Sequence, residues 1–258
     1  MSRFNNLEFD NESDDQSFQQ KPAVKDEGFY FAEAQAAFEA GHFESALRLY
    51  SKVLEFNPRN AAAWTGQVRM LIELGEFSEA RLWADKALER FPHEPELLAA
   101  KAVALGRGGD LHGALTFSDV SIEERGDTPY IWLARGDVLL ARKESRADYC
   151  FEKALLLARN DWVVSWLAAR VRFYYRQFAL ALKLLQQAIE WNAGHFLLWL
   201  ELGLCQQALG LVGSARNSFN QARQLNPRCA EADAALAGLS GPAPWRFLRG
   251  CWQRFFHR

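Results

Sequence analysis

Hydrophobic residues recur along this chain with a period of about 34 residues. One column of mostly large apolar side chains consists of Tyr30, Trp64, Leu98, Trp132, Trp166 and Trp199. A second column, about 16 residues further along, holds only alanine: Ala46, Ala80, Ala114, Ala147, Ala181 and Ala215. Two more columns follow the alanines after four and then three residues, and these spacings place all three on one face of a helix. Each period therefore predicts two helices, as in helical repeat arrays.

The predicted helices are separated by residues that end helices. A glycine lies between the two helices in units one, two, three and six, where it can adopt the left-handed conformation: Gly41, Gly75, Gly109 and Gly210. Units four and five carry Arg142 and Arg176 at this place and have one residue fewer in the turn. A proline follows the second helix in three units, at Pro58, Pro92 and Pro227, and directs the chain into the next unit.

These columns resemble the tetratricopeptide repeat family, whose pattern is W-x2-L-G-x2-Y, then A-x3-F, then P. The sixth unit carries the most complete match: Trp199, Leu202, Gly203, Ala215, Phe219, Ala222 and Pro227. The resemblance implies an all-α solenoid of about six helix-turn-helix repeats. Ala230–Leu239 follows the last repeat as an alanine-rich segment, and we expect it to form a C-terminal capping helix over the last apolar face.

The chain divides into three parts by composition. Residues 1–26 are polar and acidic, and we expect them to be disordered because they offer too little apolar surface for a core. Residues 27–240 form the predicted array with its capping helix. Residues 241–258 form a linker and a basic, aromatic tail.

The tail predicts an amphipathic helix. At 100° per residue its apolar side chains fall on one half and its arginines on the other, with no acidic residue. Such a helix suits an anionic membrane surface or a groove in a protein, and it could also pack against the array itself. The residues expected to interact are Trp245, Arg246, Phe247, Leu248, Arg249, Trp252, Arg254, Phe255 and Phe256.

The resemblance also implies a partner-binding surface, because the first helices of such repeats line a concave face. The implied groove residues are Phe31, Gln35, Phe38, Thr65, Arg69, Leu133, Asp137, Leu167, Val171, Tyr174, Leu200 and Leu204. This set is mostly apolar, with Arg69 and Asp137 as isolated charges. It favours an amphipathic helix or an apolar peptide as the ligand.

Unit five also has a basic and aromatic character, from Arg170, Arg172, Tyr174, Tyr175 and Arg176. These arginines could form a solvated helix face, which is the usual role of a run of charges. Alternatively, they could receive an acidic ligand, including the acidic N-terminal segment of the chain.

The composition argues against several other classes of protein. The net charge of −2 gives no reason to expect nucleic-acid binding. Neither a signal peptide nor an apolar stretch of membrane-spanning length is present, and the scattered cysteines fit a reducing cytoplasm. The histidines lack metal-ligand spacing, and no phosphate loop or nucleophile motif occurs, so we expect no metal, no cofactor and no enzyme activity.

Three functional hypotheses follow. The chain could be a cytoplasmic scaffold or adaptor that binds a protein helix or peptide in an apolar groove. It could instead be a peripheral membrane adaptor anchored by its tail. In a third version, the tail occupies the groove as an autoinhibitory plug.

Overall fold

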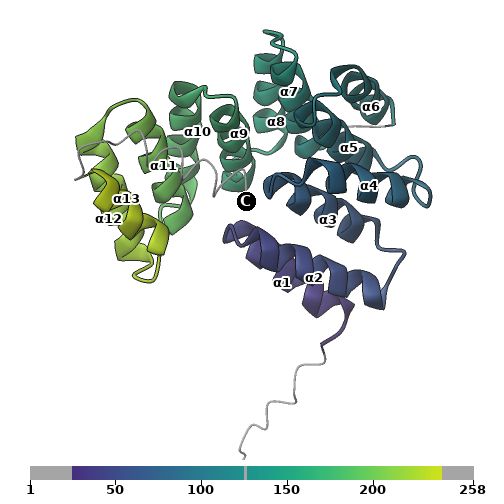
Figure 1. Cartoon of the computed structure of the whole chain (residues 1–258), viewed down its shortest axis with the longest axis horizontal. Coiled ribbons are helices and arrows are strands. Elements are labelled where there is room, and N and C mark those ends of the chain that lie inside the picture. Colours follow the sequence, from purple (N-terminus) through teal and green to yellow (C-terminus); the bar gives the residue numbers. More distant parts are fainter. Residues whose placement is uncertain (1–24, 125–126, 240–258) are drawn as a thin grey trace, which may run out of the picture.

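The structure, a computed structural model, describes residues 25–124 and 127–239, and these residues form an arc of helices (Figure 1). Every regular element in this part of the chain is α-helical. The helices are α1 Glu27–Glu39, α2 Phe43–Phe56, α3 Ala61–Glu73, α4 Phe77–Leu88, α5 Pro95–Arg107, α6 Leu111–Glu123, α7 Pro129–Ala141, α8 Ala147–Leu157, α9 Trp162–Tyr174, α10 Phe178–Trp191, α11 Phe196–Ala208, α12 Val212–Leu225 and α13 Ala230–Leu239.

The helices form six antiparallel pairs, which we call units one to six, and α13 packs against α12 and α11 after the last pair. The predicted all-α repeat architecture with a C-terminal capping helix is therefore confirmed. Polar side chains fix several helix starts: Asp26, Asn60, Asp110 and Asp161 each accept a hydrogen bond from a backbone N–H of the first turn.

The predicted alanine column forms the contact between the two helices of each unit. All six alanines are buried, with at most 1% of their surface exposed. The column four residues further along supplies larger groups in most units. Its aromatic members lie against glycines of a first helix, which belongs to the same unit for Phe151 and Phe219 and to the next unit for Tyr50. A Cβ added to Gly203 would lie 2.4 Å from the Phe219 ring, so only glycine lets this ring approach the helix.

The turns inside the units use a left-handed residue in all six cases. Gly41, Gly75, Gly109 and Gly210 have φ between 76° and 97°, as the sequence predicted. In unit five the residue is Arg176, with φ 62°. In unit four it is Lys143 (φ 59°), and the prediction of Arg142 was wrong because Arg142 still has helical φ and ψ.

A single missing residue in unit four shifts the register of everything after it. Four residues lead from Lys143 to Ala147, whereas five lead from Gly75 to Ala80. In α9 the fourth helical position, which holds the large column residue in every other unit, is therefore occupied by Ser165. The prediction that Trp166 continues this column was wrong, because Trp166 lies one residue further on and points toward the inside of the arc.

Trp166 closes the arc by contacting unit one. Its ring centroid lies 5.5 Å from that of Phe38 and 6.4 Å from that of Phe43, to which it is nearly parallel. Beside it, the Gly41 turn lies so close to Leu197 of α11 that an added Cβ would be 2.8 Å from the leucine side chain. We call these residues, Phe38, Gly41 and Phe43 with Trp166 and Leu197, the closing contact.

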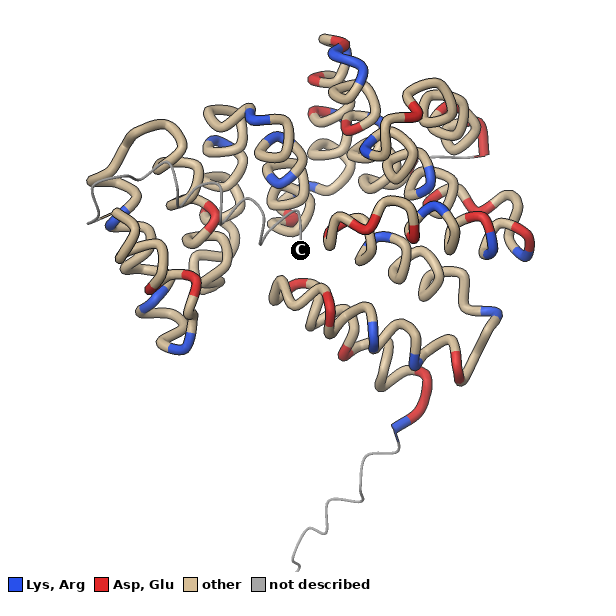
Figure 2. Tube along the Cα trace, viewed as in Figure 1, with Lys and Arg blue, Asp and Glu red and all other residues tan. Residues whose placement is uncertain are grey.

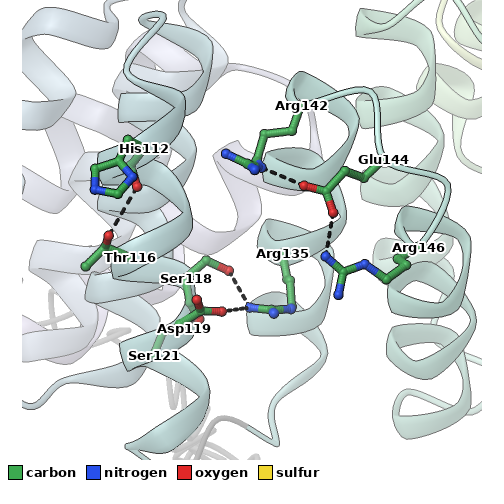
Figure 3. A network of polar contacts seen from close by, with 9 residues as sticks. All are labelled: His112, Thr116, Ser118, Asp119, Ser121, Arg135, Arg142, Glu144 and Arg146. Atoms are coloured by element: carbon green, nitrogen blue, oxygen red, sulfur yellow. Dashed lines mark hydrogen bonds and ion pairs between the residues drawn. The ribbon is translucent and has the colours of Figure 1, made fainter.

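A polar network joins units three and four away from this contact (Figure 3). Arg135 of α7 donates hydrogen bonds to Ser118 and Asp119 of α6, at 3.2 and 2.7 Å. Glu144, in the shortened turn, accepts from both Arg142 and Arg146. Its carboxylate thus holds together a turn that has lost one residue.

Candidate functional site

A pocket of about 250 Å³ opens inside the arc, and we call it the axial pocket. Five units contribute to it, although they are far apart in the sequence. Its lining consists of Gln35, Phe38, Glu39, Tyr50, Arg69, Glu96, Pro129, Tyr130, Leu133, Val163, Val164 and Leu167.

Five of the groove residues expected from the sequence line this pocket: Gln35, Phe38, Arg69, Leu133 and Leu167. Asp137 and Val171 lie deeper, in an adjoining cavity of about 30 Å³ that shares the Phe38, Arg69 and Leu133 side chains. The first helices therefore do direct these positions inward. Most of them are buried by other parts of the same chain, and an extended groove along the first helices stays a prediction.

The remaining expected residues lie outside the axial pocket. Phe31 packs edge-on against Tyr50, and Thr65 is buried with its hydroxyl donating to the Ala61 carbonyl. Tyr174 stacks with Arg107, whose guanidinium carbon lies 4.3 Å from the ring centroid. Leu200 and Leu204 are buried in unit six.

The expectation that Arg69 and Asp137 are isolated charges was wrong. Asp137 accepts hydrogen bonds from Arg107 at 2.6 Å and from the Tyr175 hydroxyl at 2.8 Å. Arg69 lies 4.0 Å from the Tyr130 ring centroid and 5.3 Å from that of Phe38, within the range of cation–π attraction. These partners come from other units of the array, and sequence spacing gave no sign of them.

The interpretation of the unit-five arginines as a solvated face or an acidic-ligand site was also wrong for two of them. Arg170 is 3% exposed and Arg172 is 5% exposed. Arg172 binds Asp148 of α8 at 2.6 Å. Arg170 bridges Glu73 of α3 and Glu201 of α11, so its charge is already neutralised inside the array.

Arg170 has this role because of the register shift in α9. It occupies the ninth helical position, which holds Gln35, Arg69, Asp137 and Leu204 in other units and which the family resemblance assigned to the concave face. Trp166, one turn earlier, donates its indole N–H to Glu201 at 2.9 Å. Recognising the missing residue before Ala147 would have identified both residues from the sequence.

The two carboxylates bound by Arg170 respond differently to burial. Burial by itself would raise the pKa of Glu73, but the guanidinium charges of Arg170 and Arg107 outweigh burial and hold the pKa below its ordinary value. Burial raises the pKa of Glu201, and the Arg170 charge offsets this only in part. Arg170 is thus the group that allows two acidic side chains to remain inside the array.

The rim of the axial pocket is acidic. Glu39 and Glu96 line it, and neither has an ion-pair partner in the described part of the chain. Burial and the nearby charge of Asp161 raise the pKa of Glu39. In Figure 2, an acidic segment at the end of α1 borders the centre of the arc, next to the acidic end of α3, whose Glu73 is paired with Arg170. The pocket therefore combines apolar walls with unpaired negative charge.

The described residues contain no group of three or more His, Cys, Asp or Glu side chains that could hold a metal ion. No helix among them is long and apolar enough to cross a membrane. Residues 1–24 of the predicted N-terminal segment and the tail interaction residues, from Trp245 to Phe256, lie outside the described part of the chain.

Known proteins share this architecture. The BBSome complex member BBS4 of Bos taurus is 24% identical over 187 residues, which cover 72% of this chain and 36% of BBS4. The chain thus spans about a third of the length of this curated relative. A tetratricopeptide repeat protein from Parabacteroides merdae superposes with a TM-score of 0.54 at 16% identity, covering 87% of this chain and 88% of that one.

A subunit structure from the APC/C hetero-tetramer Cut9–Hcn1 gives a TM-score of 0.52 at 16% identity, over 84% of this chain and 43% of that chain. These structural likenesses show the fold alone. Family models described as tetratricopeptide repeat match residues 31–95 and 173–239, about half of the chain between them. Repeat period, helix pairs and family matches agree, and the chain belongs to the tetratricopeptide repeat family.

Proposed function

We propose that this chain is a non-catalytic protein-interaction scaffold whose recognition site is the axial pocket. Family membership supports the general role of protein binding. The observation that carries the specific site is the convergence of side chains from five units on one pocket, where Glu39 and Glu96 have no ion-pair partner among the residues that the structure describes.

The size of the pocket limits what it can hold. A volume of about 250 Å³ lies slightly below the usual range for small-molecule sites. It accommodates one or two large side chains and not a whole helix. The proposed ligand is therefore a short anchoring segment of a partner, with apolar side chains for the Phe38, Leu133 and Leu167 walls and a cation for the rim.

Photo-crosslinking tests this proposal. A photoreactive side chain replaces Gln35, which is exposed at the pocket, and a matched control carries it at Glu190, which is exposed on the outer helix α10. In cell lysate we expect a discrete partner protein to crosslink at position 35 and not at position 190. The proposal fails if both positions crosslink the same proteins, or if Glu39→Lys with Glu96→Lys leaves capture at position 35 unchanged.

A peripheral membrane adaptor, anchored by residues 245–258, stays a second prediction. Its support is the composition of the tail, with four arginines, five aromatic residues and no acidic residue. The cytoplasmic location expected from the sequence also stays a prediction. Binding to anionic vesicles separates this role from the scaffold role and forms part of the next experiment.

A further inference from the structure

The axial pocket has a chemical character that a segment of the same chain matches. Its walls are apolar and aromatic, while Glu39 and Glu96 at the rim have no ion-pair partner among the described residues. Asp161 adds a further nearby negative charge. Arg69, the one basic side chain that the described residues contribute to the lining, already stacks against Phe38 and Tyr130. A ligand for this pocket needs apolar side chains together with positive charge.

Residues 245–258 have this composition. They contain Arg246, Arg249, Arg254 and Arg258 among aromatic side chains, and they lack any acidic residue. The N-terminal segment 1–26 is acidic and would be repelled by the same rim. Charge complementarity therefore favours the C-terminal segment over the N-terminal one.

The connection is also long enough. The last described helix, α13, packs against α11, and Leu197 of α11 touches the Gly41 turn beside Glu39. The connection starts at Leu239, the far end of α13, so the path to the pocket spans about two helix widths and the length of α13, on the order of 25 Å in all. At about 3.3 Å per residue, about eight extended residues cover that distance. Residues 240–244 and the start of the tail supply them.

We propose that the tail, residues 245–258, binds its own chain by inserting one or two of its aromatic side chains into the axial pocket and placing arginines at Glu39 and Glu96. This inference rests on the proposed function, because it concerns the regulation of the same pocket. A partner segment must then displace the tail, so the tail sets a threshold for partner binding.

Crosslinking within the purified full-length chain tests this inference. The photoreactive side chain at position 35 should crosslink to the peptide containing residues 245–258, and the same group at position 190 should not. Replacing the four tail arginines with glutamate should lower the yield about tenfold, because attraction at the rim becomes repulsion. Adding Glu39→Lys and Glu96→Lys to that variant should restore most of the yield.

The inference is overturned if the yield at position 35 equals that at position 190, or if the charge exchange restores nothing. Mixing isotopically light and heavy chains identifies the donor: mixed crosslinks would show that a second copy supplies the tail, which also overturns occupancy in cis. In the last part of the experiment, binding of the full-length chain to phosphatidylserine vesicles is measured. If they bind the tail while the crosslink is absent without vesicles, the tail is a membrane anchor.

The two proposals fail separately. A partner that still crosslinks at position 35 in lysate, without any tail crosslink in the purified chain, removes the cis occupant and keeps the recognition site. Loss of both crosslinks removes the site itself.

Discussion

At the scale of single residues, Arg170 decides whether the interior of the array is stable. It lies between Glu73 and Glu201, and those carboxylates come from units two and six. Because both acids are largely buried, neither can recover its hydration if the guanidinium is removed. The main effect of these ion pairs is to prevent two unpaired carboxylates from being buried; their net attraction contributes less.

Replacing Arg170 with methionine should therefore destabilise the fold strongly. We expect a loss of about 3–5 kcal/mol in the free energy of unfolding, the range for breaking a buried ion pair by removing one partner. Urea denaturation measures it. Arg81→Met, at an exposed position on α4, is the matched control and should change stability by less than about 0.5 kcal/mol. Equal effects of the two substitutions would contradict the role assigned to Arg170.

His195 makes the stability depend on pH. It precedes the first residue of α11, its ring lies 4.6 Å from that of Trp162, and burial lowers its pKa below the ordinary 6.5. The folded state thus binds this proton more weakly than the unfolded state does. The resulting stability is fully present above pH 6.5 and is lost as the pH falls through the folded-state pKa.

His195→Gln removes this titration. Urea midpoints measured from pH 8 to pH 5 should fall less steeply below pH 6.5 in the variant than in the natural chain. Parallel curves would show that other groups, such as the buried carboxylates, account for the whole dependence.

At the scale of elements, the turn of unit one differs from its counterparts because it touches another part of the array. Gly41 and Gly210 have almost the same φ, 76° and 77°. An added Cβ would lie 2.8 Å from Leu197 at Gly41 and would meet nothing within 4 Å at Gly210. The pair therefore separates the cost of backbone strain from the cost of disturbing the closing contact.

Gly41→Ala should cost more than Gly210→Ala in thermal or urea unfolding. Both substitutions place an alanine in the left-handed region, which lowers the free energy of unfolding by about 1–2 kcal/mol. Only Gly41→Ala must also displace Leu197. We expect an extra loss of about 1 kcal/mol, the lower end of the cost of overpacking. Equal losses at the two positions would mean that unit one does not press against α11 in solution.

Much of the element structure could be predicted because it depends on local spacing. The alanine column, the turn glycines and the helix Ala230–Leu239 all follow from residues within one or two helices. The register of α9 was missed because both Ser165 and Trp166 fit a period of 33 or 34 residues. One residue of shift turns a helix by 100°, so the error concealed the inward direction of Trp166 and Arg170.

At the scale of the whole molecule, the closing contact makes this array unlike a simple row of repeats. Repeats that touch only their neighbours fold and unfold locally, and their ends fray first. Here residues 97 positions apart, Glu73 and Arg170, are hydrogen-bonded, and unit one packs on units five and six. The first unit therefore shares the stability of the middle of the chain.

Trp166→Ala should uncouple unit one from the rest. Removing this fully buried indole should lower the free energy of unfolding by about 3–5 kcal/mol. Hydrogen exchange should show α1 and α2 losing protection while α5 and α7 retain it. Tyr149→Ala, at a largely exposed aromatic residue, is the control and should leave the exchange pattern unchanged. Uniform loss of protection along the chain would contradict the assigned role of Trp166.

The axial pocket could be predicted only in part, because it depends on contacts between units that are distant in the sequence. Sequence spacing identified which positions of each first helix face inward. The pairing of Asp137 with Arg107, and of Arg170 with Glu73 and Glu201, depends on how tightly the arc curves, which no single unit encodes.

The closing contact also restricts how such a chain can change in evolution. Repeat proteins usually gain or lose length by duplication or deletion of whole units. Removing one unit between α3 and α9 would shorten the arc, so Trp166 and Arg170 would fall short of Phe43 and Glu73, and Glu73 would lose its cation. A duplication would lengthen the arc and carry them past the same partners. The curvature of the arc thus fixes the number of units that can lie between the two sides of the closing contact.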